Sequence, residues 1–439
     1  MRFVRHVRRR VGSAAIGVAA ASSLVAVSFA GARWLQSRGR HLWTDAPPLT
    51  GRYAWRFSVD SLPAVAGATA GVAWAPELSR RLPFRRLLWA SFGIALAWAA
   101  LLAFADGARG FTGPPGAVVD YSRTVPHIVS PGSFLHGFVA DIHSFAGHVR
   151  SHPPGLVLVL WAMDRAGLAG PWWEAGLELV AGAASVPAAL LVAGEVLGEH
   201  RARAAAPFLM LAPAAVFWGS GDAVFLGVGA WGTALLVLAT GRRGRRSRRL
   251  ALASGVLLGF LVYLSYGLVL VGLVPFAVTR GRPRRWRTLA YAGIAFAGVV
   301  AVFTAAGFNW LSGFAAARRE VSRSVQQFRP YWFFLLADLA AFAVALGPAV
   351  WAALGRFVAG RPRERDRPAW LLLGAALVAV AIADLTGLSK GEVERIWLPF
   401  MPWIVASTGV VFDEAEQRPW LAAQAAWALA LQFAVRSPW

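Results

Sequence analysis

Residues 150–161 read RSHPPGLVLVLW and place a histidine, two prolines and a glycine directly before an apolar run. The apolar part, residues 155–168, is only about 14 residues long and contains an aspartate and an arginine, whereas a helix needs about 20 apolar residues to cross a membrane. We therefore expect a re-entrant or interfacial helix here. Pro153-Pro154 suits its first turn, where missing amide donors cost nothing.

The composition places this helix in a membrane protein. Of the 439 residues, 57% are hydrophobic and only 15% are charged, against roughly 25% charged residues in soluble domains. Several apolar runs are long enough to span, and none alternates with period two as a barrel strand does. The chain has no cysteine, which excludes disulfides, thiolate metal sites and cysteine nucleophiles. We predict an all-α polytopic membrane protein.

The net charge of +22 comes from short arginine clusters between apolar runs, which is the positive-inside pattern and does not indicate a nucleic-acid partner. We place six clusters in the cytoplasm: residues 2–10, 80–86, 201–203, 242–249, 280–287 and 361–365. Between them we predict spans at residues 11–35, 60–78, 87–106, 173–198, 204–220, 222–241, 289–308, 332–358, 369–388, 398–413 and 420–436. The first run could also be a signal peptide ending near Ala30-Gly31-Ala32, but its length favours an uncleaved span.

Counting crossings tests two ambiguous segments. If residues 155–168 crossed, the cluster at 242–249 would lie outside, so this helix should dip from the outer face and return. The run at 250–278 has basic clusters on both sides, so it should be a hairpin of two short helices that turns near residues 263–267.

This topology gathers polar residues on the outer face. The loop at residues 107–152 lies outside, as do residues 220–222, 309–331 and 389–397. This loop holds five of the eight histidines of the chain. Carboxylates inside apolar runs are costly and tend to mark functional interiors. Those found in the outer parts of spans are Glu174, Glu178, Asp338 and Asp384. The distribution indicates a cavity that opens to the outer leaflet.

Each outer polar residue also has a structural interpretation. Asp120 could be a solvated loop residue, Asp141 with His143 could cap an interfacial helix, and Asp222 could cap the helix that follows it. The pair His148 and His152 could bind a metal or a phosphate, or could be interfacial polar residues. A surface salt-bridge cluster is the alternative for Glu392, Glu394 and Arg395.

The order of these motifs resembles the GT-C glycosyltransferases, which include protein O-mannosyltransferases and actinobacterial mannosyl- and arabinosyltransferases. The resemblance rests on Asp120 after a span, HPPG at 152–155, GDAVF around Asp222 and GEVERIWLPFMP at 391–402. It implies a GT-C-like fold of about 11–13 membrane helices. The catalytic module would occupy residues 87–413 with its external loop at 107–154, preceded by two transmembrane helices at 1–86 and followed by one at 414–439.

The resemblance also implies a function at the plasma membrane, with a cytoplasmic N-terminus and an external active site. A polyprenyl-phosphate sugar would be the donor and an envelope glycan, lipid or protein the acceptor, with membrane lipids as further partners. Asp120 would be the base in a direct displacement at the anomeric carbon, and Asp141 and Asp222 are further catalytic candidates. Candidates for the donor phosphate are Arg395, His152 and Arg123, with Arg150 and Arg329 in reserve. Candidates for substrate binding are Tyr121, His143, His148, Glu392 and Glu394.

No cofactor is predicted, although a divalent metal stays an alternative. The sequence VVDYS around Asp120 lacks the second adjacent acidic residue of some members, which argues against an acidic pair or a metal. The competing functions are a flippase or transporter of lipid-linked sugars and a non-catalytic scaffold of envelope synthesis. The residues do not distinguish mannose from arabinofuranose as the sugar.

Overall fold

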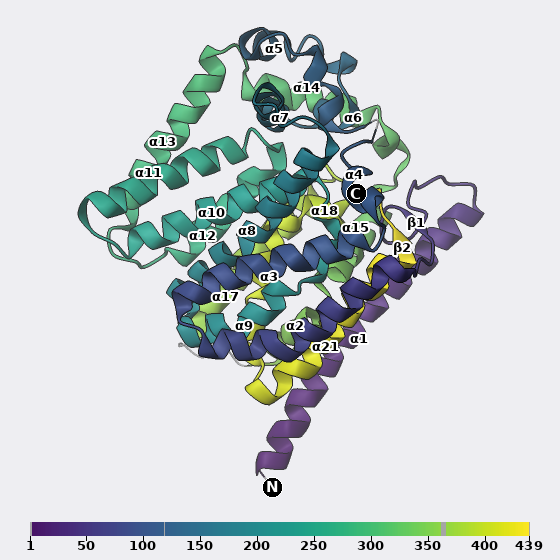
Figure 1. The fold of residues 1–439 in the computed structure, drawn as a ribbon, viewed down its shortest axis with the longest axis vertical. Helices are drawn as coiled ribbons and strands as arrows, with labels where there is room; N and C mark the ends of the chain where they lie inside the picture. Colours follow the sequence, from purple (N-terminus) through teal and green to yellow (C-terminus); the bar gives the residue numbers. More distant parts are fainter. Residues whose placement is uncertain (1, 118, 361–365, 439) are drawn as a thin grey trace.

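The computed structural model describes residues 2–117, 119–360 and 366–438 and is almost entirely helical (Figure 1). Within these residues, six helices are long and apolar enough to cross a membrane: Gly12–Ser37 of α1 (Arg2–Ser37), α3 (Phe84–Phe104), α8 (Pro171–Leu197), α10 (Gly221–Thr240), α13 (Arg285–Ala305) and α17 (Arg367–Leu385). Two further long helices, α2 (Leu62–Arg81) and α21 (Glu414–Ala434), run beside them. The prediction of an all-α multi-pass protein is confirmed.

Three predicted spans are broken, and a proline or glycine accounts for each break. In place of 204–220 the chain forms α9 (Glu199–Met210) and the 3-10 helix η5 (Pro213–Phe217). In place of 332–358 it forms α15 (Tyr331–Leu346) and α16 (Pro348–Ala359), which meet at 109°. In place of 398–413, after the short helix α18 (Val393–Ile396), it forms three short helices: η9 (Leu398–Phe400), which contains Pro399, α19 (Met401–Val405), which contains Pro402, and α20 (Thr408–Val411).

The break between α15 and α16 depends on Gly347. Its φ of +82° lies in the left-handed region, and a Cβ at this position would lie 2.7 Å from Oε1 of Gln424. A side chain would therefore meet both backbone strain and a collision. Gln424 also accepts a hydrogen bond from the amide of Ala349 at 2.9 Å, so α21 holds the corner in place.

The predicted hairpin at 250–278 is present. It consists of α11 (Gly244–Leu261), a turn, and a returning arm of η6 (Tyr266–Gly272) and α12 (Leu273–Val278). After this arm, Arg282 approaches Glu195 at the end of α8, and Arg242 at the end of α10 does the same. Both arms therefore start and finish at one end of the bundle.

Helix α7 (Gly155–Arg165), which begins at the glycine of HPPG, contacts this hairpin and has only 11 residues, fewer than the roughly 20 that a span needs. The amide of Gly155 donates to the carbonyl oxygen of Tyr263 at 2.8 Å, and a Cβ on Gly155 would lie 2.4 Å from that oxygen. The glycine of HPPG is therefore needed for the close approach of the helix to the turn. The two prolines directly precede the first helical residue rather than lying in the first turn.

The remaining short elements cap the same end of the bundle as α7, at the top of Figure 1. These are α4 (Ala108–Thr112), η2 (Tyr121–Arg123), η3 (Val125–His127), α5 (Pro131–Gly137), η4 (Ile142–Ser144), α6 (Gly147–Ser151), α14 (Trp310–Ser322) and η7 (Val325–Phe328). We refer to this end as the outer end, following the predicted topology.

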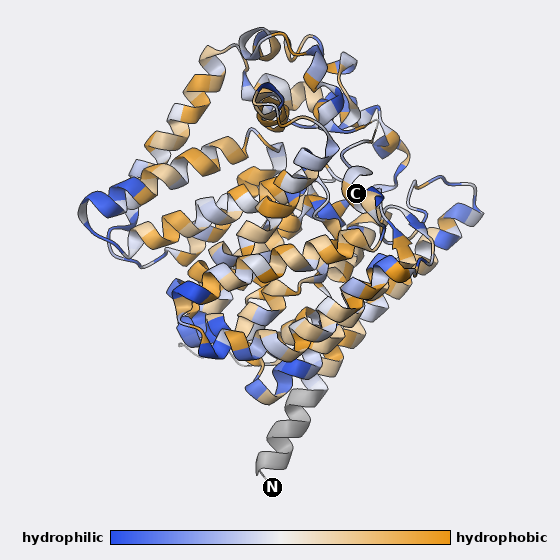
Figure 2. Cartoon of the chain, viewed as in Figure 1, coloured by the Kyte–Doolittle hydropathy of each residue, from blue (hydrophilic) through white to orange (hydrophobic). Residues whose placement is uncertain are grey.

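Ion pairs and hydrogen bonds hold several arginines of, or near, the predicted cytoplasmic clusters at the opposite end. The contacts are Arg203 to the carbonyl of Ser79, Arg201 to Asp366, Arg242 and Arg282 to Glu195, and Arg356 to Glu416. The cluster at 361–365 lies outside the described residues. Figure 2 shows hydrophilic segments at this lower-left edge around an apolar body. One-sided clustering agrees with the predicted topology.

Two segments that are far apart in the sequence pair with each other near the outer end. Strand β1 (Arg52–Tyr53), which precedes η1 (Val59–Ser61) and α2, pairs antiparallel with β2 (Val435–Arg436) directly after α21. Helix α1 packs along α15 and α16 and approaches α16 very closely, because a Cβ on Gly17 would lie 2.1 Å from the carbonyl oxygen of Trp351. The first two helices are thus packed into the body of the protein.

Candidate functional site

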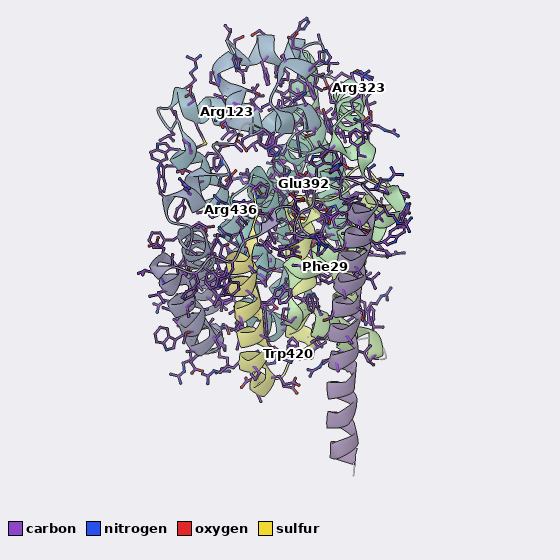
Figure 3. The ribbon with its side chains drawn as sticks, turned by 90° about the vertical axis from the view of Figure 1, so that its right-hand side faces the viewer. Phe29, Arg123, Arg323, Glu392, Trp420 and Arg436 are labelled. Atoms are coloured by element: carbon purple, nitrogen blue, oxygen red, sulfur yellow. The ribbon has the colours of Figure 1, made fainter. Side chains whose placement is uncertain are left out.

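Segments distant in sequence bring charged residues together at the outer end of the bundle. Asp120 immediately precedes η2, His148 lies on α6, Asp222 lies in the first turn of α10, and Arg395 lies on α18. In Figure 3, Glu392, Arg123 and Arg436 lie in the upper half of the molecule and Trp420 lies near the bottom. The site is therefore on the end opposite the basic clusters.

Asp120 is held in a defined orientation. Its side chain is buried, with 5% of the residue exposed, and Oδ1 accepts a hydrogen bond from the amide of Ser122 at 3.3 Å. Oδ2 lies 3.6 Å from Nδ1 of His148. Nε2 of His148 lies 3.5 Å from an Nη2 donor of Arg395. A histidine tautomer with its hydrogen on Nδ1 satisfies both neighbours, so His148 links Asp120 to Arg395.

The fold supplies Asp120 with the acidic neighbour that the local sequence lacks. Glu174, in the first turn of α8, is close enough to hydrogen-bond Asp120 and Ser122. Two carboxyl groups can share a hydrogen bond only when one of them carries a proton. Glu178 is buried one turn further along α8. Although the sequence identified both glutamates as costly residues in a span, it did not place them beside Asp120.

Arg395 is the centre of the cationic part of the site. Its Nη1 donates to Asp222 and its Nη2 donates to Glu392 at 2.6 Å, with 3% of the residue exposed. Burial alone would lower the pKa of Arg395, but the carboxylates of Asp222 and Glu392 outweigh burial and raise it. Burial would likewise raise the pKa of Glu392, but the charges of Arg395 and Arg329 lower it. The guanidinium is therefore permanently charged and faces two carboxylates.

Arg329 fastens the N-terminal part of the chain to this cluster. Its Nε donates to the carbonyl of Leu42 at 2.9 Å and its Nη2 to that of Trp43 at 3.2 Å, while its Nη1 lies 3.7 Å from Glu392. Burial lowers the pKa of Arg329, partly offset by Glu392. The segment that precedes α2 thus lies against the site, which the sequence did not indicate, because residues 42–50 carry no motif of their own.

Glu394 faces this N-terminal segment and not Arg395. Its Oε1 accepts a hydrogen bond from the amide of Thr50 at 3.0 Å. Burial raises the pKa of Glu394 to about 7. Its position is that of a structural anchor for the segment, whereas the sequence suggested substrate binding.

The aromatic rings of Tyr121 and His152 form the uncharged side of the site. The ring of Tyr121 lies 5.4 Å from that of His148 and 5.6 Å from that of His152. Nδ1 of His152 donates to the carbonyl of His148 at 2.9 Å, and burial lowers the pKa of His152 to about 4. Burial also raises the pKa of Tyr121. Both side chains are therefore neutral near pH 7.

Three predicted site residues lie away from the cluster. Asp141 is exposed, and His143 instead meets Glu320 of α14, with Nδ1 3.4 Å from Oε1. Arg123 donates to the carbonyl of Gly116 at 2.8 Å. Of the reserve cations, Arg150 lies 3.9 Å from Glu320. In the described part of the chain, no group of three or more metal-ligating side chains has the arrangement of a metal site.

No protein-family model matches the sequence, and no curated protein matches it. Among solved structures, ArnT from Cupriavidus metallidurans in the apo state matches with 17% identity and a TM-score of 0.43, over 65% of this chain and 55% of that one. The Archaeoglobus fulgidus oligosaccharyltransferase, in complex with Zn and sulfate, matches with 14% identity and a TM-score of 0.43, over 78% of this chain and 53% of that one. The chain spans about half the length of each. These values are too low to assign a family or an activity.

Proposed function

We propose that the protein is a membrane glycosyltransferase that moves a sugar from a polyprenyl-phosphate donor to an envelope acceptor at the outer face. The observation that supports this function best is the position of Asp120. Its buried carboxylate is oriented by Ser122 and His148. Arg395 lies on the other side of His148, so one side chain separates the carboxylate from the cation.

This arrangement suits direct displacement at the anomeric carbon. A lipid phosphate is already a good leaving group, so the reaction needs a base for the acceptor hydroxyl and a cation for the departing phosphate. Asp120 is the proposed base. Glu174 would carry the one proton of the acidic pair and donate it in a hydrogen bond to Asp120. Asp120 would then stay ionised and could accept the proton of the acceptor hydroxyl.

Arg395 is the proposed contact of the donor phosphate. Its two carboxylate partners differ in exposure, because the side chain of Asp222 is buried while that of Glu392 is 22% exposed. Glu392 also has a φ of +66° on a short loop. A phosphate would therefore take the place of Glu392 at Nη2 and leave the buried pair with Asp222 intact.

The experiment is release of polyprenyl phosphate from radiolabelled polyprenyl-phosphate mannose or arabinose by the purified protein in lipid, with and without an envelope-glycan extract. The variant is Asp120→Asn, and the matched control is Asp164→Asn, an exposed aspartate on α7. We expect acceptor-dependent release by the wild type and the control, and a loss of at least about 100-fold in Asp120→Asn, as for removal of a general base.

Equal release by the wild type and Asp120→Asn would exclude Asp120 as the base. A flippase would move the donor across the membrane without breaking the bond to phosphate, and a scaffold would do neither. Failure of both donors to turn over, together with donor transfer between leaflets in proteoliposomes, would replace the transferase by a flippase.

A further inference from the structure

A second binding region lies beside the Asp120 cluster and shares none of its residues. It is a cavity of about 570 Å³ between the outer ends of α3 and α8, the short helices α4 and η5, and the chain that follows α21. Ala175 and Leu179 line it, each one residue after the glutamates that face Asp120. The two regions therefore border adjacent faces of helix α8. We infer that this cavity binds the phosphate-bearing headgroup of a membrane lipid, independently of the transferase reaction.

The charges that line the cavity favour an anion. Three arginines, Arg56, Arg109 and Arg436, face one carboxylate, that of Asp106. Arg56 forms an ion pair with Asp106 and donates to the carbonyl of Gln432 at 2.9 Å. In the described chain no ion pair holds Arg109 or Arg436, and both are exposed. Two arginines with free planar donors at the wall of a cavity match the oxygens of one phosphate.

The position of Arg109 is fixed by the local backbone. The chain leaves α3 through Gly107, with a φ of +62°, and folds α4 back onto the end of α3. A Cβ on Gly110 would lie 1.8 Å from the carbonyl oxygen of Ala103. Only glycine permits this close approach, and the turn sets Arg109 above the cavity.

The walls indicate that the phosphate belongs to a lipid. Ala99 and Ala103 of α3 and Leu179 of α8 continue the cavity downward between two predicted spans. At its rim Phe111 stacks on Trp172, with ring centroids 5.5 Å apart, and Trp172 is exposed. Exposed tryptophans mark the headgroup level of a membrane, and basic pockets between spanning helices hold lipid headgroups. A free phosphate ion would gain nothing from apolar walls.

Binding of dioctanoyl phosphatidic acid to the purified full-length protein in nanodiscs tests the inference. This probe contains no sugar, and dioctanoylglycerol is the same molecule without phosphate. The test variant is Arg109→Gln/Arg436→Gln. The control, Arg318→Gln/Arg323→Gln, removes the same charge from two exposed arginines near the outer end (Arg323 in Figure 3).

We expect the test variant to bind phosphatidic acid about tenfold or more weakly, since it loses two charged donors to the phosphate oxygens. The control variant and Asp120→Asn should bind as the wild type does, and dioctanoylglycerol should bind all proteins weakly. Arg109→Lys/Arg436→Lys, which keeps the charge but not the planar donors, should bind more tightly than the test variant and less tightly than the wild type.

Two results would overturn the inference. If the test variant binds phosphatidic acid like the control, these arginines do not hold the headgroup. If inorganic phosphate binds as tightly as phosphatidic acid and loses the same affinity in the test variant, the site takes free phosphate and the lipid assignment is wrong. Because Asp120→Asn is scored for binding and not for turnover, neither result depends on the proposed transferase.

Discussion

Arg395 contacts Asp222, Glu392 and His148 at once, so the order of the outer cluster depends on this side chain. Breaking a buried ion pair by removing one partner leaves an uncompensated charge and costs about 3–5 kcal/mol. Removing both partners costs less than the sum of the two single changes.

We therefore expect Arg395→Gln to lower the free energy of unfolding by roughly 3–5 kcal/mol. Asp222→Asn should also destabilise the protein, and the double variant should lose less than the two losses added. Denaturant unfolding in detergent micelles measures all three, with Arg323→Gln as an exposed control. Additive losses would mean that the two side chains do not interact.

His152 makes the stability depend on pH. Burial lowers its pKa to about 4, whereas in the unfolded chain a histidine takes up its proton near pH 6.5. The unfolded state therefore binds more protons between these values, and this contribution to stability is complete above about pH 6.5 and is lost as the pH falls toward about 4.

We expect the wild type to lose on the order of 3 kcal/mol more than His152→Gln when the pH falls from about 6.5 to 4. Unfolding curves at several pH values measure this difference. His127→Gln, which changes an exposed histidine, should follow the wild type. Parallel pH profiles for the wild type and His152→Gln would show that His152 is not the group responsible.

The residues of the site were largely predictable and their partners were not. Asp120, Asp222 and Arg395 stand out in the sequence because charged residues next to apolar spans are costly to bury and tend to mark functional sites. The approach of Glu174 to Asp120 depends on the rotation of α8 about its axis, and no local pattern in the sequence sets that rotation. The contact between Arg329 and Leu42 links the ends of two loops 287 residues apart, through a backbone carbonyl that any residue type provides.

At the scale of elements, prolines and glycines decided where sequence prediction succeeded. HPPG and the short apolar run after it predicted a short helix, and α7 has 11 residues; that it does not cross the membrane stays a prediction. Hydropathy averaged over a window does not register a break, so Gly347 and Pro399 lay inside segments that were predicted to be continuous spans. These breaks let the chain turn within the bundle and bring α18 to Asp222.

The crossing of α1 and α16 is an element contact that can be tested. Small residues at such a crossing let two backbones approach closely, and Gly17 leaves no space for a Cβ beside Trp351. We expect Gly17→Leu to separate the helices and to lower the midpoint of thermal unfolding by several degrees. Gly12→Leu, with nothing within 4 Å of its Cβ position, should have little effect. Equal midpoints would show that α1 is not packed in this way.

At the scale of the whole molecule, arginines of the clusters at 201–203, 242–249 and 280–287 make their contacts at one end, and the candidate site lies at the other. The sequence predicted this separation because arginine clusters and apolar runs alternate along the chain. Which end faces the cytoplasm still rests on the positive-inside rule.

The absence of cysteine makes the orientation directly measurable. Arg245→Cys at the start of α11 and Ser144→Cys in η4 introduce single exposed thiols at opposite ends. In intact cells we expect a membrane-impermeant maleimide to label Ser144→Cys and not Arg245→Cys, and both after lysis. The reverse pattern in intact cells would invert the topology and move the candidate site to the cytoplasm.

The pairing of β1 with β2 has a practical consequence for protein production. The residues after α21 close the sheet and then run along the cavity, where Arg436, Ser437 and Pro438 form part of the wall. A bulky group joined directly after Pro438 would start at the wall of that cavity. Fusion partners for purification or imaging are therefore better placed away from the residues that follow α21.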